Sequence, residues 1–329
     1  MWIWSRLWLV FGFGFVFVPT GTDHNWNQHS TSRFILKNQI KHKLLKHLIP
    51  DPDVNPYIEY PMTFMSNKSI AILGCGGMGL AIARRLGAGR QLYVADFSTE
   101  ILAAARETLT NDGYLVEIMQ VDVADYESVK RFAHAAASHG PIEAIIHTAG
   151  LSPSAGSAQR ILEVDLIGTA NSLDAFVEVA KPGTSMICIA SMAGHMGSGL
   201  PSELEHHLAT ASRDQLLEHA ALSIDVADTH GPARAYGISK RGNILRVQAS
   251  AKAWGRVGGK SQFRAGRQEI EGPAGKFIAS SPVSRVGTPQ DIVNAVSFLA
   301  SAESSFITGN DILVDGGVVS SLKWGTGKD

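Results

Sequence analysis

Cysteine is scarce in this 329-residue sequence, which contains only Cys75 and Cys188. Each stands among apolar neighbours, so we expect two buried thiols in a reducing compartment and not a disulfide framework. The sequence also lacks an excess of charge of either sign, since its formal net charge is −1. Such a balance provides no electrostatic basis for binding nucleic acid.

The amino-terminal region lacks an apolar run long enough for a membrane span. Residues 7–18 are twelve apolar or glycine residues that follow Arg6, whereas a span needs about 20 residues. The run resembles part of a signal peptide, but no A-x-A-like cleavage site follows it. Residues 22–64 are polar and contain several prolines, which predicts a poorly ordered linker. We expect residues 1–67 to lie outside the folded domain, and membrane association or export through residues 1–18 stays open.

Metal ligands at the close spacing of a binding site are missing as well. The extension carries scattered histidines, namely His24, His29, His42 and His47. The neighbours His206 and His207 would point to different faces of a helix. No cysteine or carboxylate cluster supports either group, so we expect no bound metal.

From residue 68 onward, apolar runs alternate with amphipathic stretches. The pattern predicts strands at 69–74, 91–96, 115–123, 142–150 and 185–191, with helices at 79–87, 99–113, 125–140 and about 157–180. Strands that are apolar throughout and separated by helices are typical of a parallel sheet covered on both faces. Right-handed crossovers make such a sheet doubly wound. We predict a single α/β domain of the Rossmann type over 68–320, followed by a tail at 321–329.

A glycine-rich turn follows the first predicted strand. Gly74, Gly76 and Gly79 fit the pattern G-x-G-x-x-G, after a strand and at the start of a helix. These glycines permit a tight turn and a close approach of the backbone to a pyrophosphate. Asp96 ends the second strand, where a carboxylate can bond the ribose hydroxyls of adenosine and repel a 2′-phosphate. The sequence therefore predicts a dinucleotide site that prefers NAD to NADP.

The segment AYGISKRGN, residues 235–243, places a tyrosine and a lysine one helical turn apart. Tyr236 and Lys240 would share one face of a helix, close enough to touch. A lysine cation beside a phenol favours the phenolate, so we expect the pKa of Tyr236 to fall from about 10. Tyr236 would then be usable as an acid or base near neutral pH. The alternative is an unrelated pair on a helix surface.

The motifs stand in the order found in short-chain dehydrogenases/reductases, which the chain resembles from about residue 68 to 317. Besides the glycine turn, the matching pieces are Asp122 with Val123, TAG (148–150), SMAG (191–194), YGISK (236–240) and ITGNDILVDGG (307–317). The resemblance implies transfer of a hydride between a secondary alcohol or ketone and NAD. It also implies a cytoplasmic homo-oligomer with a small-molecule substrate, and we expect that substrate to be hydrophobic.

The resemblance implies a role for each matching residue. The cofactor would lie against Gly74, Gly76, Gly77, Met78, Gly79, Asp96, Phe97, Asp122, Val123, Ala149 and Gly150. Tyr236 would exchange the proton at the reacting oxygen, and Ser191 would orient that oxygen. Lys240 would lower the pKa of Tyr236 and bond the nicotinamide ribose.

Asp165 is a departure from the family pattern. The chain reads VDLIG where the family usually has VNxxG, so an aspartate replaces a catalytic asparagine. Its carboxylate could hold a water and a lysine relay, and it would add a negative charge near Lys240. We include Asp165 among the catalytic candidates. Asn171 lies nearby in the sequence but not at the matching position.

A second departure concerns residues 255–275, where the family has a hydrophobic sixth strand. No apolar run occurs there, and SQFRA (261–265) is a poor candidate for a strand. The last strand, 311–317, ordinarily pairs with the sixth, so a gap would leave backbone groups unpaired. We therefore expect a weakened carboxy-terminal half of the sheet. This departure and Asp165 favour the alternative of a degenerate nucleotide-binding relative without turnover.

Ser191 and Tyr236 are 45 positions apart, and residues 195–232 form an insertion compared with most of the family. The capping-box spacing of Ser202 with Glu205, and of Ser212 with Gln215, predicts one or two short helices. An insertion beside the active site suggests a lid or a substrate loop. A surface decoration or an oligomer contact is the alternative. His195 would either line the substrate pocket or have no role.

Overall fold

The computed structural model describes residues 9–10, 15–16, 66–196, 199–265 and 281–325. The chain divides into two units, Met1–Met62 and Thr63–Asp329. In the first unit, β1 (Leu9–Val10) pairs antiparallel with β2 (Phe15–Val16). The linker expected at 22–64 lies outside the described residues. Within the described ranges, no helix is both long and apolar enough to cross a membrane.

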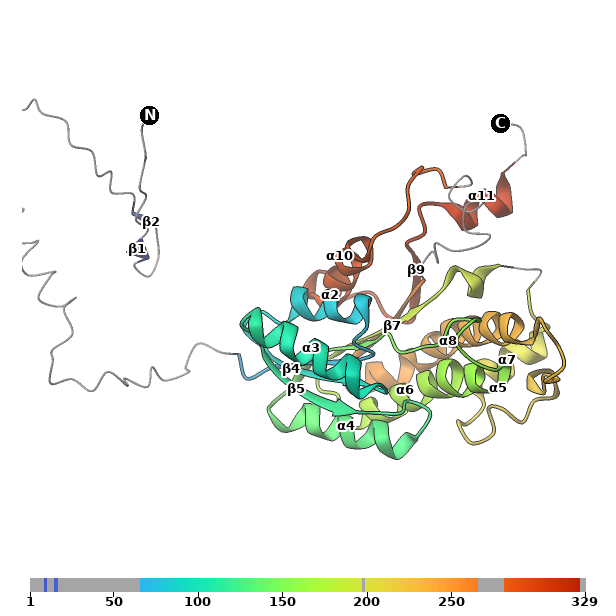
Figure 1. The fold of residues 1–329 in the computed structure, drawn as a ribbon, viewed down its shortest axis with the longest axis horizontal. Coiled ribbons are helices and arrows are strands. Elements are labelled where there is room, and N and C mark those ends of the chain that lie inside the picture. The colour runs from blue at the N-terminus through green and yellow to red at the C-terminus, as the bar shows by residue number, and fades with distance from the viewer. Residues whose placement is uncertain (1–8, 11–14, 17–65, 197–198, 266–280, 326–329) are drawn as a thin grey trace, which may run out of the picture. The chain divides into compact units, whose positions relative to one another are not determined.

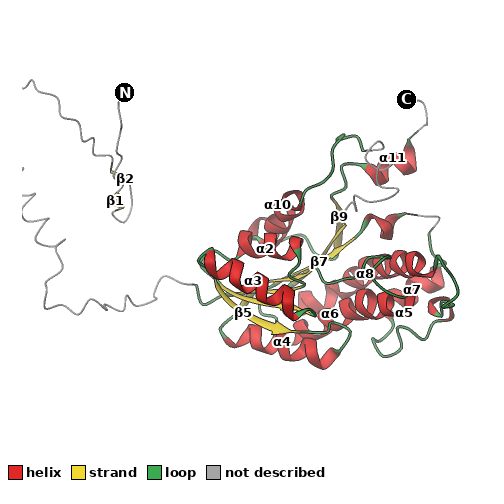
Figure 2. Ribbon diagram, in the orientation of Figure 1, coloured by secondary structure: helices red, strands yellow, loops and turns green. Residues whose placement is uncertain are grey.

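One parallel sheet forms the centre of the second unit (Figures 1 and 2). Its seven strands lie in the order β5 (Leu115–Gln120), β4 (Gln91–Asp96), β3 (Ser69–Leu73), β6 (Ile142–His147), β7 (Ser185–Ala190), β8 (Lys260–Ala265) and β9 (Asn310–Leu313). Every neighbouring pair is parallel. The order reverses between β3 and β6, which is the switch point at which doubly wound sheets bind ligands. The predicted fold class is confirmed.

Helices cover both faces of this sheet because successive strand residues point to opposite faces (Figure 2). Ala71 and Leu73 of β3 pack in one buried cluster, which α4 (Tyr126–Ser138), α6 (Gly168–Val179) and α8 (Gly231–Arg256) complete. Ile70 and Ile72 face the other way. Their cluster is completed by α2 (Gly77–Leu86), α3 (Thr99–Asn111) and α10 (Pro289–Ala300). A short helix, α11 (Val318–Trp324), follows β9 and runs from the expected domain into the expected tail.

The segment 255–275 does contain a strand, β8, at the position of the poor candidate SQFRA (261–265), so the expected gap in the sheet does not occur. β8 pairs with β7 from Lys260 to Ala265, and its second half pairs with β9. Ser261 and Gln262 are buried although both are polar. Their side chains donate hydrogen bonds to the carbonyl oxygens of Val247 and Ile307, at 3.2 and 2.9 Å. These bonds offset the cost of burying polar groups, so the strand forms without an apolar run. Residues 266–275 lie outside the described residues.

The insertion contributes one α-helix, α7 (Ser202–Thr210), and a 3₁₀ turn, η3 (Ala220–Leu222). Four leucines of the insertion are buried in a cluster with Ile238 of α8, namely Leu204, Leu208, Leu216 and Leu222. Arg246 of α8 also donates hydrogen bonds to the carbonyl oxygens of Leu208 and Ala211. The insertion is therefore packed onto α8 along much of its length.

The two capping boxes expected in the insertion do not form. Pro201 occupies the N-cap position of α7, so Ser202 is the first helical residue. Glu205 pairs instead with Arg241 of α8, at 2.7 Å. The Ser212 hydroxyl bonds the Gln215 side chain at 3.0 Å, and a turn follows it instead of a second α-helix. A contact with α8 thus replaces the expected cap at Ser202, and a side-chain bond within the insertion replaces the one at Ser212.

Candidate active site

The glycine turn lies at the carboxyl end of β3. Gly74 has a positive φ of 90°, and a Cβ there would lie 2.6 Å from the backbone nitrogen of Ala149. A Cβ on Gly79 would overlap the carbonyl oxygen of Gly74. Gly76 and Gly77 differ, because nothing lies within 4 Å of a Cβ at either position. Packing thus requires glycine at positions 74 and 79, whereas Gly76 and Gly77 leave open space at the amino terminus of α2.

Asp96 is held beside this turn by two backbone groups. Its carboxylate accepts hydrogen bonds from the N–H groups of Cys75 and Ser98, at 2.8 and 3.0 Å. Burial, reinforced by the charge of Asp96, raises the pKa of the Cys75 thiol to about 12. Burial alone raises the pKa of Cys188 to about 12. Both cysteines are free and buried, as predicted.

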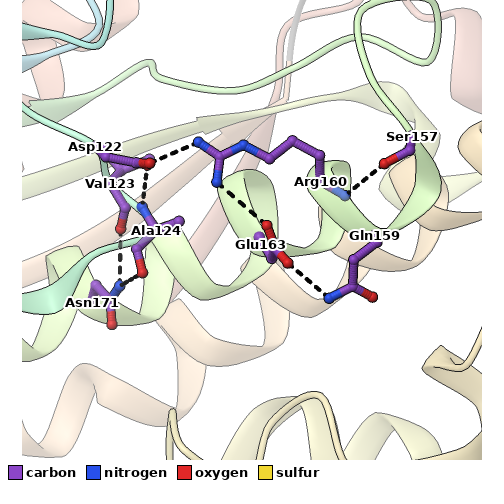
Figure 3. Close-up of polar contacts among 8 residues, drawn as sticks. All are labelled: Asp122, Val123, Ala124, Ser157, Gln159, Arg160, Glu163 and Asn171. Atoms are coloured by element: carbon purple, nitrogen blue, oxygen red, sulfur yellow. Dashed lines mark hydrogen bonds and ion pairs between the residues drawn. The ribbon is translucent and has the colours of Figure 1, made fainter.

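Arg160 joins the loop after β5 to the helix that follows β6 (Figure 3). Its guanidinium pairs with Asp122 at 2.8 Å and with Glu163 at 3.3 Å. The hydrogen bond to Asp122 is the largest contribution that raises the pKa of Arg160. The guanidinium carbon also lies 5.7 Å from the ring centroid of Phe97, whose side chain is 62% exposed. No sequence motif marks Arg160, and the sequence analysis missed it.

Asn171 stabilises the loop after β5, which contains Val123 and Ala124 (Figure 3). The Asn171 amide donates to the carbonyl oxygens of Val123 and Ala124, at 2.9 and 3.1 Å. Both bonds are made by a side chain that is only 2% exposed. Asn171 therefore supports the loop and does not replace the asparagine missing at position 165.

The TAG segment after β6 connects the glycine turn to Lys240. The Thr148 hydroxyl donates to the carbonyl oxygen of Gly74 at 2.6 Å, and the Ala149 N–H donates to that of Leu73 at 2.9 Å. A Cβ on Gly150 would lie 3.0 Å from Lys240 Nζ and 3.3 Å from an oxygen of Asp165. Gly150 thus permits the close approach of both charged side chains.

Asp165 and Lys240 form a buried ion pair, with 2.8 Å between Oδ2 and Nζ. The other carboxylate oxygen accepts the Leu151 N–H at 2.6 Å. Asp165 lies in a π-helical turn, η1 (Leu162–Ile167), between α5 (Ala158–Ile161) and α6. Such turns are frequent at functional sites. The expected proximity of Asp165 to Lys240 is confirmed.

Tyr236 lies on α8 one turn before Lys240, and it is partly buried. The lysine Nζ is 5.0 Å from the centroid of the tyrosine ring. The sequence spacing thus brings the two side chains together as predicted. His147, at the end of β6, is a further neighbour that the sequence analysis missed. Burial, followed by the charge of Lys240, lowers the pKa of His147 to about 3, so its imidazole is neutral.

Ser191 follows β7 and caps a 3₁₀ turn, η2 (Met192–His195), by accepting the Ala193 N–H at 3.2 Å. A Cβ on Gly194 would lie 2.8 Å from the backbone carbonyl of Lys240, so this turn packs directly on α8. His195 pairs with Asp311 of β9 at 2.6 Å. The structure therefore gives His195 a partner in the last strand.

Comparison with known proteins is in agreement with this geometry. The family model of short chain dehydrogenases matches residues 68–202, and that of enoyl-(acyl carrier protein) reductases matches residues 220–319. The chain is 33% identical to the short-chain dehydrogenase/reductase bsc3 of Alternaria brassicicola, over 78% of this chain and 98% of that protein. This chain belongs to the short-chain dehydrogenase/reductase family. It is thus an oxidoreductase of a family that uses NAD(H) or NADP(H).

Other members of the family are similar over the same part of the chain. The 3-oxoacyl-[acyl-carrier-protein] reductase MabA of Mycobacterium tuberculosis is 30% identical over 78% of this chain and 94% of its own length. A solved short-chain dehydrogenase/reductase from Serratia marcescens superposes with a TM-score of 0.61. That structure is 18% identical and covers 78% of this chain and 99% of its own, so it supports the fold alone.

Proposed function

We propose that the protein is an NAD-dependent oxidoreductase that interconverts a secondary alcohol and a ketone, with Tyr236 as the acid and base. The observation that carries the proposal is the position of Lys240. Its Nζ lies 5.0 Å from the Tyr236 ring centroid, and it approaches Gly150 of the segment that is bonded to the glycine turn. The Lys240 ammonium group therefore lies next to both Tyr236, the proposed proton-transfer group, and the segment beside the predicted nucleotide site.

The residues around the glycine turn fit a dinucleotide. The open space at Gly76 and Gly77 would accept a pyrophosphate at the amino terminus of α2. Met78 continues this turn, and Ala149 lies against Gly74. When bound, the nicotinamide supplies a hydride to a carbonyl carbon or accepts one from an alcohol.

The adenosine half would lie toward β4 and β5. Asp96 would bond the ribose hydroxyls and repel a 2′-phosphate, and exposed Phe97 follows it directly. Asp122 and Val123 would border the adenine, next to the Arg160 guanidinium. The carboxylate at position 96 is the reason to propose NAD and not NADP.

Three side chains of this chain would act on the substrate oxygen or the cofactor. Tyr236 would give the oxygen a proton during ketone reduction and remove it during alcohol oxidation. Ser191 would donate a hydrogen bond to the same oxygen, and Lys240 would bond the nicotinamide ribose. The insertion packs beside Tyr236 through α7, which supports its proposed role at the substrate entrance. The leucines of the insertion are buried against α8, so they give no information on the substrate. A hydrophobic substrate stays a prediction, which a panel of ketones would test.

A Tyr236→Phe variant tests the proposal because the ring keeps its packing and loses only the hydroxyl. We expect NADH binding, measured by cofactor fluorescence, to stay within about twofold of the unmodified chain. Reduction of secondary ketones should fall by at least about 100-fold, the scale of a lost general acid. Unchanged turnover would contradict the role of Tyr236. Bound NADH without turnover in the unmodified chain, over a broad ketone panel, would instead support the degenerate relative.

We also propose a homo-oligomer, as is common in the family. Two exposed apolar side chains support this proposal, since Phe306, shortly before β9, is fully exposed and Phe298 of α10 is 39% exposed. Sedimentation equilibrium that gives the mass of one chain would contradict it.

A further inference from the structure

The Asp165–Lys240 ion pair adds a negative charge to the acid–base group of the proposed active site. The carboxylate is 0% exposed and the lysine 5% exposed. Both carboxylate oxygens have a fixed partner, Lys240 for one and the Leu151 N–H for the other. The geometry therefore fixes an anion 2.8 Å from the cation that faces Tyr236.

Other charged groups on elements packed against α8 have partners of their own. The pairs are Glu205 with Arg241 from α7 to α8, His195 with Asp311 from η2 to β9, and Arg160 with Asp122 and Glu163 from α5. Asp174 of α6 interacts with Arg246, and Lys260 of β8 bonds the Ser304 hydroxyl. His147 of β6 is neutral, as is the buried thiol of Cys188. Asp165 differs from all these groups because it pairs with Lys240 itself.

The electrostatic consequence follows from the sign of each charge. A cation near a phenol stabilises the phenolate, and an anion in contact with that cation weakens its field at the phenol. Burial strengthens both effects because water screens them less. The carboxylate of Asp165 therefore weakens the electrostatic field of the lysine at the Tyr236 phenol.

We propose that Asp165 is a positioning residue that holds Lys240 and keeps the Tyr236 phenol protonated near neutral pH, the form required for reducing a carbonyl compound. This inference rests on the proposed function. In that reduction the hydride brings two electrons to the carbonyl carbon, and the C=O π bond breaks. The oxygen takes the proton of the Tyr236 hydroxyl, the nicotinamide is oxidised, and the phenolate regains a proton from solvent.

Tyrosine ionisation measured by ultraviolet absorbance tests this inference without any turnover. The signal of the Tyr236→Phe variant is subtracted from that of the full chain, which isolates the ionisation of Tyr236. The same subtraction is made with both proteins carrying Asp165→Asn. We expect the midpoint to fall by about one pH unit in the Asn background, the lower end of the effect of one nearby charge. An unchanged or higher midpoint would overturn the inference.

Two further variants keep the test decisive. Asp165→Ser replaces Asp165→Asn if the latter does not fold, as judged by circular dichroism, and should lower the midpoint in the same way. The matched control is Glu163→Gln, which removes a carboxylate from the same π-helical turn but pairs with Arg160. It should leave the midpoint within about 0.3 pH units. A shift as large as that of Asp165→Asn would show a general charge effect and overturn the specific role.

The activity profile gives the second readout. The alkaline limb of ketone reduction by NADH should move to lower pH by about one unit in Asp165→Asn. Alcohol oxidation should begin at correspondingly lower pH, with KM for NADH little changed. If no ketone is reduced by the unmodified chain, the proposed function fails, whereas the tyrosine titration still decides the role of Asp165.

Discussion

His147 and Asp165 both interact with Lys240, but only Asp165 forms an ion pair with it. Asp165 gains the lysine as a partner at 2.8 Å, whereas neither ring nitrogen of His147 has a hydrogen-bond partner among the residues that the structure describes. Burial, followed by the positive charge of Lys240, lowers the pKa of His147 from its usual value of 6.5 to about 3. The His147 imidazole is thus neutral, because protonating it in this buried position beside Lys240 costs free energy.

A His147→Leu variant should lack this cost. Its free energy of unfolding should therefore fall less than that of the unmodified chain as the pH drops below 6.5. The unfolded chain binds a proton at His147 below pH 6.5, and the folded chain does not until about pH 3. The contribution of the neutral His147 to folding stability is therefore fully present above pH 6.5 and is lost as the pH falls from 6.5 to about 3. The loss approaches about 1.4 kcal/mol per pH unit. Urea unfolding of both proteins at several pH values measures the difference, and parallel pH profiles would contradict the assignment.

The sequence predicted some of these residues and not others, for identifiable reasons. Tyr236 and Lys240 have helical spacing, and Asp165 stands at a recognisable motif position. Arg160 and His147 belong to no motif, and their roles depend on contacts between elements distant in the sequence. Side chains of that kind are found only when the strands and helices are placed next to one another.

At the scale of elements, the strands from β3 to β7 were predictable because most residues of each are apolar. β8 was not, since Ser261 and Gln262 are buried through hydrogen bonds that hydropathy does not record. α10 carried a signal that the sequence analysis did not use. Thr288 and Asp291 form a capping box, with proline at the first helical position.

Hydrogen exchange over β8 tests whether this polar strand is a stable part of the sheet. Backbone pairing with β7 and β9 on its two sides predicts slow exchange over 261–265. The amides of β7 serve as the internal reference. Gln262→Ala should remove the bond to the Ile307 carbonyl and cost about 1–3 kcal/mol. Exchange as fast as that of the exposed turn at 225–229 would contradict a paired β8.

At the scale of the whole second unit, function follows from where the strands end. Gly74, Asp96, Asp122, Gly150 and Ser191 come at or just after the carboxyl ends of five parallel strands, so the fold brings them to one edge of the sheet. α8 then places Tyr236 and Lys240 at the same edge. The sequence predicted this arrangement from motif order, whereas the packing of the insertion on α8 required the structure.

The most direct test of the account is a fluorescence titration of the full chain with NADH and, in parallel, with NADPH. The account predicts that NADH binds more tightly by at least about tenfold, because the Asp96 carboxylate repels a 2′-phosphate. Asp96→Asn keeps the side-chain size and should reduce that ratio. Equal or tighter binding of NADPH by the unmodified chain would contradict the NAD assignment, and no binding of either by folded protein would contradict the proposed oxidoreductase.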